Sequence, residues 1–315
     1  MANVVFIHGI ANKPEKEVLH RLWRDALSRN DGLHLGAEGI ESSMVYWADV
    51  LYSKPKAEMA EHESNDSVVE REDDVDMSWQ AALSDQELVW VENLQKRLGY
   101  DLDAPDGSED FCPSEKAMTD LESLDFERIP LPWWLKRRLM KILLKDVHHY
   151  LFNAEFSPRS GTTYRVQDEI RNRFVDALNQ ARQKEGPLVV VSHSMGTVIA
   201  YDCLMRDPRC PPVDALMTIG SPLGLDEIQD KLHPEWTREN GFPEKVKGDW
   251  RNVYDRLDPV AGFDPNIAND YQKRGAKVIS DINEQNSGAW RHNISKYLMG
   301  DKLRTALSDQ LKLDD

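Results

Sequence analysis

The chain is poor in cysteine and in long apolar runs, and each shortage excludes a class of protein. Three cysteines, Cys112, Cys203 and Cys210, occur in 315 residues. Their odd number and their spacing form neither a disulfide framework nor a C-x-x-C zinc site. No apolar run approaches the roughly 20 residues that a membrane-spanning helix needs. The 17 glycines and 16 prolines follow no fixed period, which excludes collagen-like and low-complexity chains.

Acidic residues outnumber basic ones by 55 to 39, and the resulting net charge of −16 repels nucleic acid. Nine acidic side chains and one basic, Arg71, lie between residues 57 and 76, where we expect a solvated, mobile loop. The chain begins Met-Ala-Asn and passes at once into an apolar segment, without the basic and long apolar regions of a signal peptide. We therefore expect a cytoplasmic protein, and an apolar fraction of 40% suffices for a large core.

Apolar runs alternate with helical spacing over most of the chain. A strand over 4–7, a helix over 15–29 and a strand over 43–52 suggest a βαβ unit at the start. After residue 160 the same rhythm resumes. Strands are predicted at 188–191, 213–219, 251–254 and 276–282, and helices at 165–184, 195–206 and 294–311. This order predicts a three-layer α/β fold with a mostly parallel sheet.

The segment between these two parts follows a different pattern. Residues 53–160 are predicted to be a mainly helical cap inserted into a core made of residues 1–52 and 161–315. Helices are expected over 79–98 and 130–152, with a loop at 101–115. The second helix is basic and amphipathic. It either packs its apolar face on the core with its lysines outside, or contacts a membrane surface through Trp133–Lys145.

One serine lies between a valine-rich strand and a helix. The run Ser192-His193-Ser194-Met195-Gly196 places Ser194 where a strand turns sharply into a helix, with small residues two positions before and after it. This pattern resembles the G-x-S-x-G nucleophile elbow of α/β-hydrolases, with Ser192 in place of the first glycine. The alternative is an ordinary strand-to-helix turn with a capping serine.

Two further motifs add to this resemblance. His8-Gly9-Ile10 follows the first strand, and the run from Thr218 to Gly224, a T-x-G-S-P strand end, follows a later one. Together they make the chain similar to the lipase and carboxylesterase members of the α/β-hydrolase superfamily. The resemblance implies an oxyanion hole formed by the backbone N–H groups of Ile10 and Met195. It places the substrate beside His8, Gly9, His193 and Leu223, and it requires no cofactor and no metal.

The order Ser, acid, His in this superfamily selects the other members of a triad. Only His233 and His292 follow Ser194, and His292 is favoured because it lies after the last strand and just before the last helix. Asp258, in Asp-Pro-Val after a strand, is the favoured acid. Asp255 and Asp264 are the alternatives.

These residues predict a serine hydrolase that cleaves small-molecule or lipid esters through an acyl-enzyme. Two alternatives stay open: a phospholipase or lipid deacylase acting at a membrane, and a non-catalytic interaction protein with the same fold. Thioesters and amides are attacked by the same chemistry. The sequence does not fix the acyl chain, the alcohol or the oligomeric state.

Overall fold

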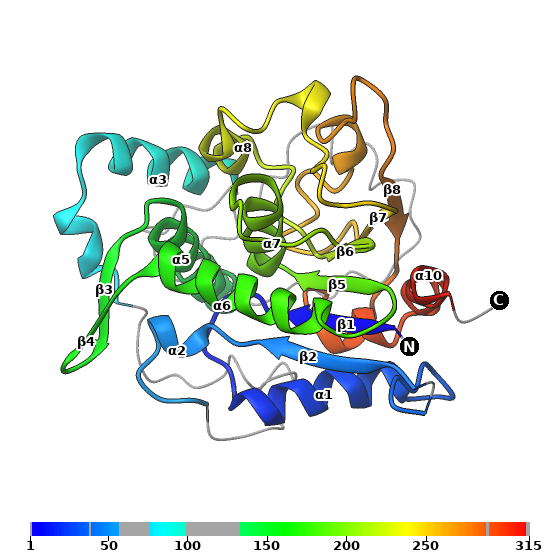
Figure 1. The fold of residues 1–315 in the computed structure, drawn as a ribbon. Helices are drawn as coiled ribbons and strands as arrows, with labels where there is room; N and C mark the ends of the chain where they lie inside the picture. Colours follow the sequence, from blue (N-terminus) through cyan, green and yellow to red (C-terminus); the bar gives the residue numbers. More distant parts are fainter. Residues whose placement is uncertain (1, 38, 57–75, 99–132, 288–289, 313–315) are drawn as a thin grey trace.

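The computed structural model describes residues 2–37, 39–56, 76–98, 133–287 and 290–312 (Figure 1). The acidic segment 57–76, apart from Asp76, and the predicted loop 101–115 therefore lie outside the described residues. The centre of the fold is a six-stranded sheet in the order β2-β1-β5-β6-β7-β8. Every neighbouring pair in it is parallel. Its strands are β1 (Asn3–Ile7), β2 (Glu41–Val45), β5 (Leu188–His193), β6 (Ala215–Ile219), β7 (Trp250–Tyr254) and β8 (Ser280–Asn283).

Helices cover both faces of this sheet because its central strands are apolar on both faces. In β1, Val5 and Ile7 belong to one buried cluster, while Val4 and Phe6 belong to another on the opposite face. Side chains alternate between the two faces of a strand, so a strand with an uninterrupted apolar run must be covered on both faces of the sheet. The predicted three-layer α/β arrangement with a parallel sheet is confirmed at this level.

Different helices cover the two faces of the sheet (Figure 1). One face packs against α1 (Lys16–Ser28), α9 (Ile294–Leu298) and α10 (Asp301–Leu311). The other packs against α2 (Ala48–Leu51), α6 (Val166–Arg182), α7 (Met195–Arg206) and α8 (Asp226–Leu232). The chain enters α7 directly from β5, so the start of α7 lies at the carboxyl edge of the sheet, where ligands of parallel sheets bind.

Two helices lie further out on this second face. Helix α3 (Asp85–Arg97) is capped at its amino end by Ser84, whose side chain forms a capping box with Glu87. It packs against α5 (Trp133–Leu151), and α5 packs on α6. The short 3₁₀ helix η2 (Ser78–Ala82) precedes α3, so the helix expected over 79–98 is two shorter elements.

Helix α5 is a core helix over most of its described length. From residue 138 to its end, every side chain is buried or half-buried, and even Lys141 is only 7% exposed. Its apolar side chains share one hydrophobic cluster with β1, β5 and α6. The side chains of residues 133–137 are outside the description. The division into a core and a 53–160 cap stays a prediction.

Several predicted boundaries are wrong. The strand expected over 43–52 ends at Val45, and α2 follows it, because the backbone N–H and the indole of Trp47 turn inward to His8. The strand expected over 276–282 is limited to β8. The helix expected over 294–311 breaks at Gly300, where a Cβ would lie 2.4 Å from the Glu284 carboxylate. An antiparallel hairpin, β3 (Glu155–Arg159) with β4 (Thr162–Arg165), was not predicted.

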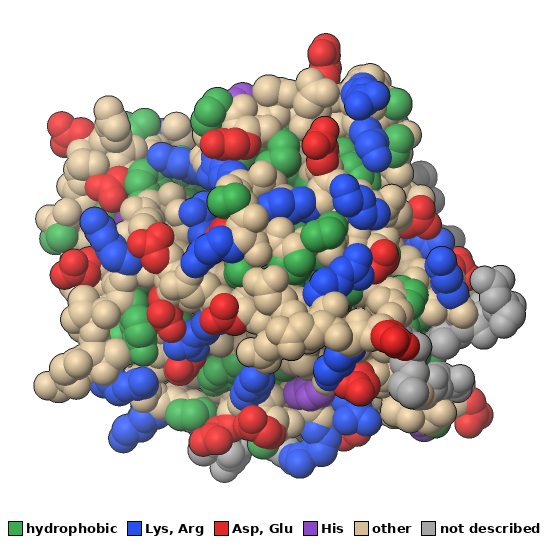
Figure 2. Space-filling view, viewed as in Figure 1, with side chains coloured by type: hydrophobic (Ala, Val, Ile, Leu, Met, Phe, Trp, Pro, Cys, Tyr) green, Lys and Arg blue, Asp and Glu red, His purple; other side chains and the backbone are tan. Residues whose placement is uncertain are grey.

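The surface carries charges of both signs. On the face seen in Figure 2, lysine and arginine side chains are interspersed with aspartate and glutamate. Among the described helices, none combines the length and the apolar composition that crossing a bilayer would need.

Candidate active site

Ser194 occupies a strained turn between β5 and α7. Its backbone has φ 54° and ψ −129°, a region that residues with a side chain seldom adopt. The turn is also tight, because a Cβ on Gly196 would lie 2.7 Å from the carbonyl oxygens of Ile7 and His8. Only glycine allows α7 to start this close to the end of β1. Such strain is typical of functional positions, and an ordinary capping turn does not require it.

Three buried side chains form a hydrogen-bonded chain that ends at this serine. The His292 Nε2 lies 2.9 Å from the Ser194 Oγ. The opposite ring nitrogen, Nδ1, lies 2.8 Å from both carboxylate oxygens of Asp258. Ser194 is fully buried, and Asp258 and His292 are 2% and 4% exposed. Since Asp258 is an acceptor, Nδ1 carries the proton, which leaves Nε2 free to accept one from the serine.

Asp258 stays ionised although it is buried. Burial alone would raise its pKa, but the His292 imidazole and the hydrogen bonds that the carboxylate accepts outweigh burial, so the pKa is lowered from its ordinary value. The Val260 N–H donates to Oδ1 over 2.7 Å, and the Tyr297 hydroxyl donates to Oδ2 over 2.7 Å. A buried carboxylate with several donors can hold an imidazole in one orientation.

The alternative residues lie elsewhere. Asp255 accepts from the Leu257 N–H in an Asx turn and pairs with Arg291 over 3.1 Å. Asp264 is half-buried, and its pKa is raised to about 6 by burial and by the nearby Asp270 and Asp226. The His233 ring is exposed and packs against Trp236. The structure therefore brings together Ser194, Asp258 and His292 and none of the three alternatives.

The backbone N–H groups of Ile10 and Met195 belong to two segments that adjoin Ser194. The loop over residues 8–11 lies against Ser194, since a Cβ on Gly9 would come within 2.5 Å of the Ser194 Cβ. The Met195 N–H is the first of α7, where the helix dipole favours negative charge. Within the described part of the chain, neither the Ile10 N–H nor the Met195 N–H has a hydrogen-bond acceptor. With respect to the described residues, both groups are available to donate to a ligand.

The buried His8 side chain stabilises the loop over residues 8–11 through hydrogen bonds to the backbone. The Trp47 backbone N–H donates to the His8 Nε2 over 3.0 Å, so that nitrogen carries no proton. The His8 Nδ1–H donates to the Gly9 carbonyl over 2.9 Å. Burial, followed by the charge of Lys13, lowers the pKa of His8 well below its usual value, so the ring stays neutral. Both ring nitrogens are occupied by backbone, and contact of His8 with substrate stays a prediction.

His193 holds the backbone of the proposed base. Its Nε2–H donates to the His292 carbonyl oxygen over 3.0 Å, and the two rings are 4.7 Å apart. Burial and the neighbouring His292 lower the pKa of His193 well below its ordinary value. The residue directly before the serine thus fixes the loop that carries His292. Substrate contacts of His193, Gly9 and the fully buried Leu223 stay predictions.

Sequence analysis missed two residues at this site. Tyr297 is fully buried, and its hydroxyl links the Asp258 carboxylate to the Asp255 N–H, 2.9 Å away. Gly220 has φ +55°, and a Cβ there would lie 3.1 Å from Asp258 Oδ2 and 3.3 Å from the His292 ring. Gly220 belongs to the T-x-G-S-P motif, which marks its position. No local pattern marks Tyr297, because its role depends on a contact across 39 residues.

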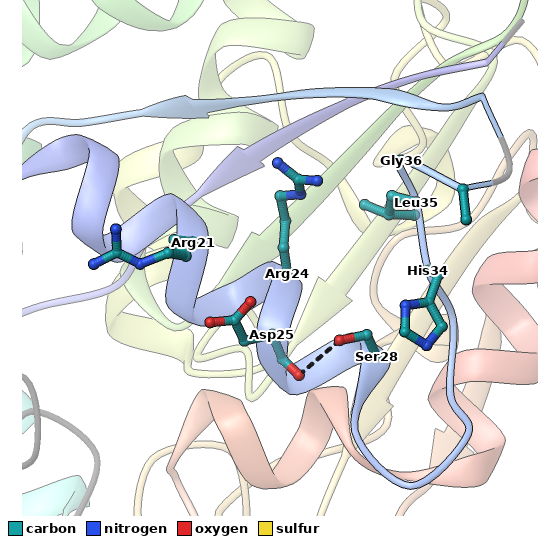
Figure 3. Close-up of a pocket in the computed structure, with 8 residues that line it drawn as sticks. Arg21, Arg24, Asp25, Ser28, His34, Leu35 and Gly36 are labelled. Atoms are coloured by element: carbon teal, nitrogen blue, oxygen red, sulfur yellow. Dashed lines mark hydrogen bonds between the residues drawn. The ribbon is translucent and has the colours of Figure 1, made fainter.

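A pocket lies away from Ser194, between α1 and the loop that leads to β2 (Figure 3). Four polar residues of its lining, Arg21, Arg24, Asp25 and His34, are all exposed. The loop lies at the amino end of β2, whereas Ser194 follows the carboxyl end of β5. Among the residues that the structure describes, no group of three His, Cys, Asp or Glu side chains is placed to hold a metal ion.

No protein-family model matches the chain, and no curated protein matches it either. The resemblance to α/β-hydrolases therefore rests on the motifs and on the arrangement around Ser194.

Proposed function

We propose that this protein is a serine hydrolase of the α/β-hydrolase type that cleaves carboxylic esters, with Ser194, His292 and Asp258 as its catalytic triad. The observation that carries the proposal is the hydrogen-bonded chain from the Ser194 Oγ through His292 to Asp258, with the serine in a strained turn. The protonation states that these contacts require are those of a resting triad.

The chemistry follows from these positions. His292 Nε2 takes the hydroxyl proton as the Ser194 oxygen attacks the ester carbonyl, and Asp258 stabilises the imidazolium that forms. The N–H groups of Ile10 and Met195 donate to the oxyanion, each contributing about 3 kcal/mol to transition-state stabilisation. The imidazolium then protonates the leaving alcohol. Water, deprotonated by His292, attacks the acyl-enzyme, releases the acid and restores the serine.

Substrate must displace protein to reach the serine, because Ser194 is fully buried in this conformation. A small acyl group requires a smaller opening than a long chain. This observation favours a short-chain ester over a lipid, and the membrane-acting alternative has no support from the described side chains of α5.

The test is hydrolysis of p-nitrophenyl esters from acetate to palmitate, below and above the concentration at which the long chains aggregate. We expect turnover that is greatest with short chains and that falls by several orders of magnitude in Ser194→Ala. Ser192→Ala is the matched control, since that buried hydroxyl donates to the Met217 carbonyl over 2.9 Å and not to the triad. A rise at long chains upon aggregation would favour a lipase.

A fluorophosphonate probe gives a second readout, because it labels activated serines whatever the substrate. Labelling is expected in the wild type and in Ser192→Ala, and its loss is expected in Ser194→Ala. If no ester is hydrolysed and no label is incorporated, the non-catalytic alternative replaces this proposal.

A further inference from the structure

A buried carboxylate on α5 contacts the loop that carries the proposed oxyanion donor. Asp146 has no exposed surface, and its Oδ2 accepts a hydrogen bond from the Ala11 N–H over 2.9 Å. The Tyr52 hydroxyl, at the end of α2, lies 3.0 Å from both oxygens of the same carboxylate. Three segments far apart in the sequence therefore meet at Asp146.

The residue that Asp146 holds has a strained backbone. Ala11 has φ +72°, in the left-handed region that a residue with a Cβ seldom adopts. Such a conformation persists only where the surrounding structure fixes it. Ala11 directly follows Ile10, so a change at the Ala11 peptide also reorients the neighbouring Ile10 backbone.

Helix α5 supports this carboxylate firmly. One turn after Asp146, the Tyr150 hydroxyl donates to Asp202 of α7 over 2.6 Å. The Arg171 guanidinium of α6 binds the Asp202 carboxylate in a bidentate manner, over 2.7 and 2.8 Å. These bonds join α5 to α6 and α7 without reaching Asp146. The Asp146 carboxylate is held on α5 by the neighbouring buried side chains of Leu143 and Val147, which share one hydrophobic cluster with β1, β5 and α6, and functional groups are positioned best from such rigid elements.

We propose that Asp146 is a positioning residue for the oxyanion hole: by holding the Ala11 N–H it fixes the direction in which the Ile10 N–H points. The proposal rests on the hydrolase function proposed above. The carboxylate touches no reacting atom and acts only through the loop over residues 8–11.

The charges around Asp146 are consistent with an ionised acceptor at neutral pH. Burial raises its pKa to about 6, while the Ala11 N–H, the Tyr52 hydroxyl, Lys145 and Lys13 oppose that rise. Arg138 adds a further positive charge near Tyr52. A charged acceptor holds a backbone N–H more strongly than a neutral one does.

The experiment compares Asp146→Ala with Asp146→Asn. The first removes the acceptor, and we expect kcat for a short-chain ester to fall on the order of 10- to 100-fold while KM changes less than about threefold. The second keeps an oxygen that can accept from the Ala11 N–H, and its kcat should stay within about threefold of the wild type. Affinity for a trifluoromethyl ketone, whose adduct with serine carries an oxyanion, should fall in proportion to kcat.

Tyr150→Phe is the matched control, because it removes a buried hydrogen bond of the same helix that does not reach the loop. It should lower the melting temperature and leave kcat unchanged. If Asp146→Ala does not fold, the double variant Tyr52→Phe with Asp146→Leu replaces the buried polar pair by apolar side chains and leaves only the Ala11 N–H unpaired. An unchanged kcat in every folded Asp146 variant, or an equal loss in Tyr150→Phe, would overturn the proposal.

Amide hydrogen exchange separates this inference from the proposed function. The Ala11 N–H should be protected in the wild type and in Tyr150→Phe, and should exchange faster in Asp146→Ala. If the wild type hydrolyses no ester and is not labelled by the probe, only the hydrolase proposal fails, because Ala11 exchange still tests whether Asp146 holds the loop. If Ala11 exchanges equally in all variants, Asp146 does not hold the loop, whatever the activity.

Discussion

Replacing Asp258 by asparagine should abolish the proposed hydrolase activity by changing the His292 tautomer, without disturbing the site. The carboxylate Oδ1 accepts the N–H groups of Val260 and Ala261 over 2.7 and 3.2 Å, so the amide oxygen of the variant must take that position. The amide NH₂ then faces His292 and donates to its Nδ1. With Nδ1 as an acceptor, the proton moves to Nε2, and the imidazole can no longer take a proton from Ser194.

The expected loss is about 10⁴-fold in kcat, or about 5 kcal/mol of transition-state stabilisation. It should be measured with a short-chain p-nitrophenyl ester, and nitrogen-15 shifts of the His292 ring should show the proton moving from Nδ1 to Nε2. Asp255→Asn is the control, because its carboxylate is equally buried but binds Asn286 and Arg291. A kcat within tenfold of the wild type in Asp258→Asn, with a thousandfold loss in Asp255→Asn, would refute this assignment.

Three further predictions concern other parts of the site. Tyr297→Phe removes one donor to the Asp258 carboxylate and should lower kcat about tenfold with KM unchanged; equal kcat values would contradict this role. Gly196→Ala places a Cβ against two carbonyl oxygens, so denaturant unfolding should show a loss of about 1–3 kcal/mol, although alanine is the better helix former. In the folded protein the pKa of Asp146 is about 6, whereas in the unfolded chain it is about 3.9. Between these two pH values the folded state binds more protons than the unfolded state, so its stability falls as pH rises through that range. Relative to Asp146→Asn, the free energy of unfolding of the wild type should therefore rise by about 2 kcal/mol when the pH is lowered from about 7.5 to about 4.5. A difference that does not change with pH would show that the carboxyl titrates normally beside Lys13, Lys145 and Tyr52.

The sequence predicts the parts of this fold that depend on local pattern. Uninterrupted apolar runs such as 188–191 must be buried on both faces, and the parallel sheet follows from their alternation with helices. The placement of Ser194 at a strand-to-helix turn follows from the same pattern. Chain order and position relative to the last strand and helix then selected His292, which lies 2.9 Å from the serine.

Long-range contacts account for what the sequence does not predict. The strand expected through residue 52 ends early because Trp47 donates to His8, 39 residues away, and this tertiary contact outweighs local strand propensity. Asp146 and Tyr297 look like ordinary helix residues in the sequence, and their roles depend on partners more than 30 residues away.

At Ser194, the positive φ makes the residue that the proposed catalysis needs less favourable for folding than glycine. Glycine is the residue that this backbone conformation favours, so serine at this position costs on the order of 1–3 kcal/mol of folding free energy. Ser194→Gly would relieve the strain and remove the hydroxyl in one step. Directed evolution for heat resistance alone should therefore drift toward an inactive chain at position 194, whereas selection for turnover has to retain the less stable residue.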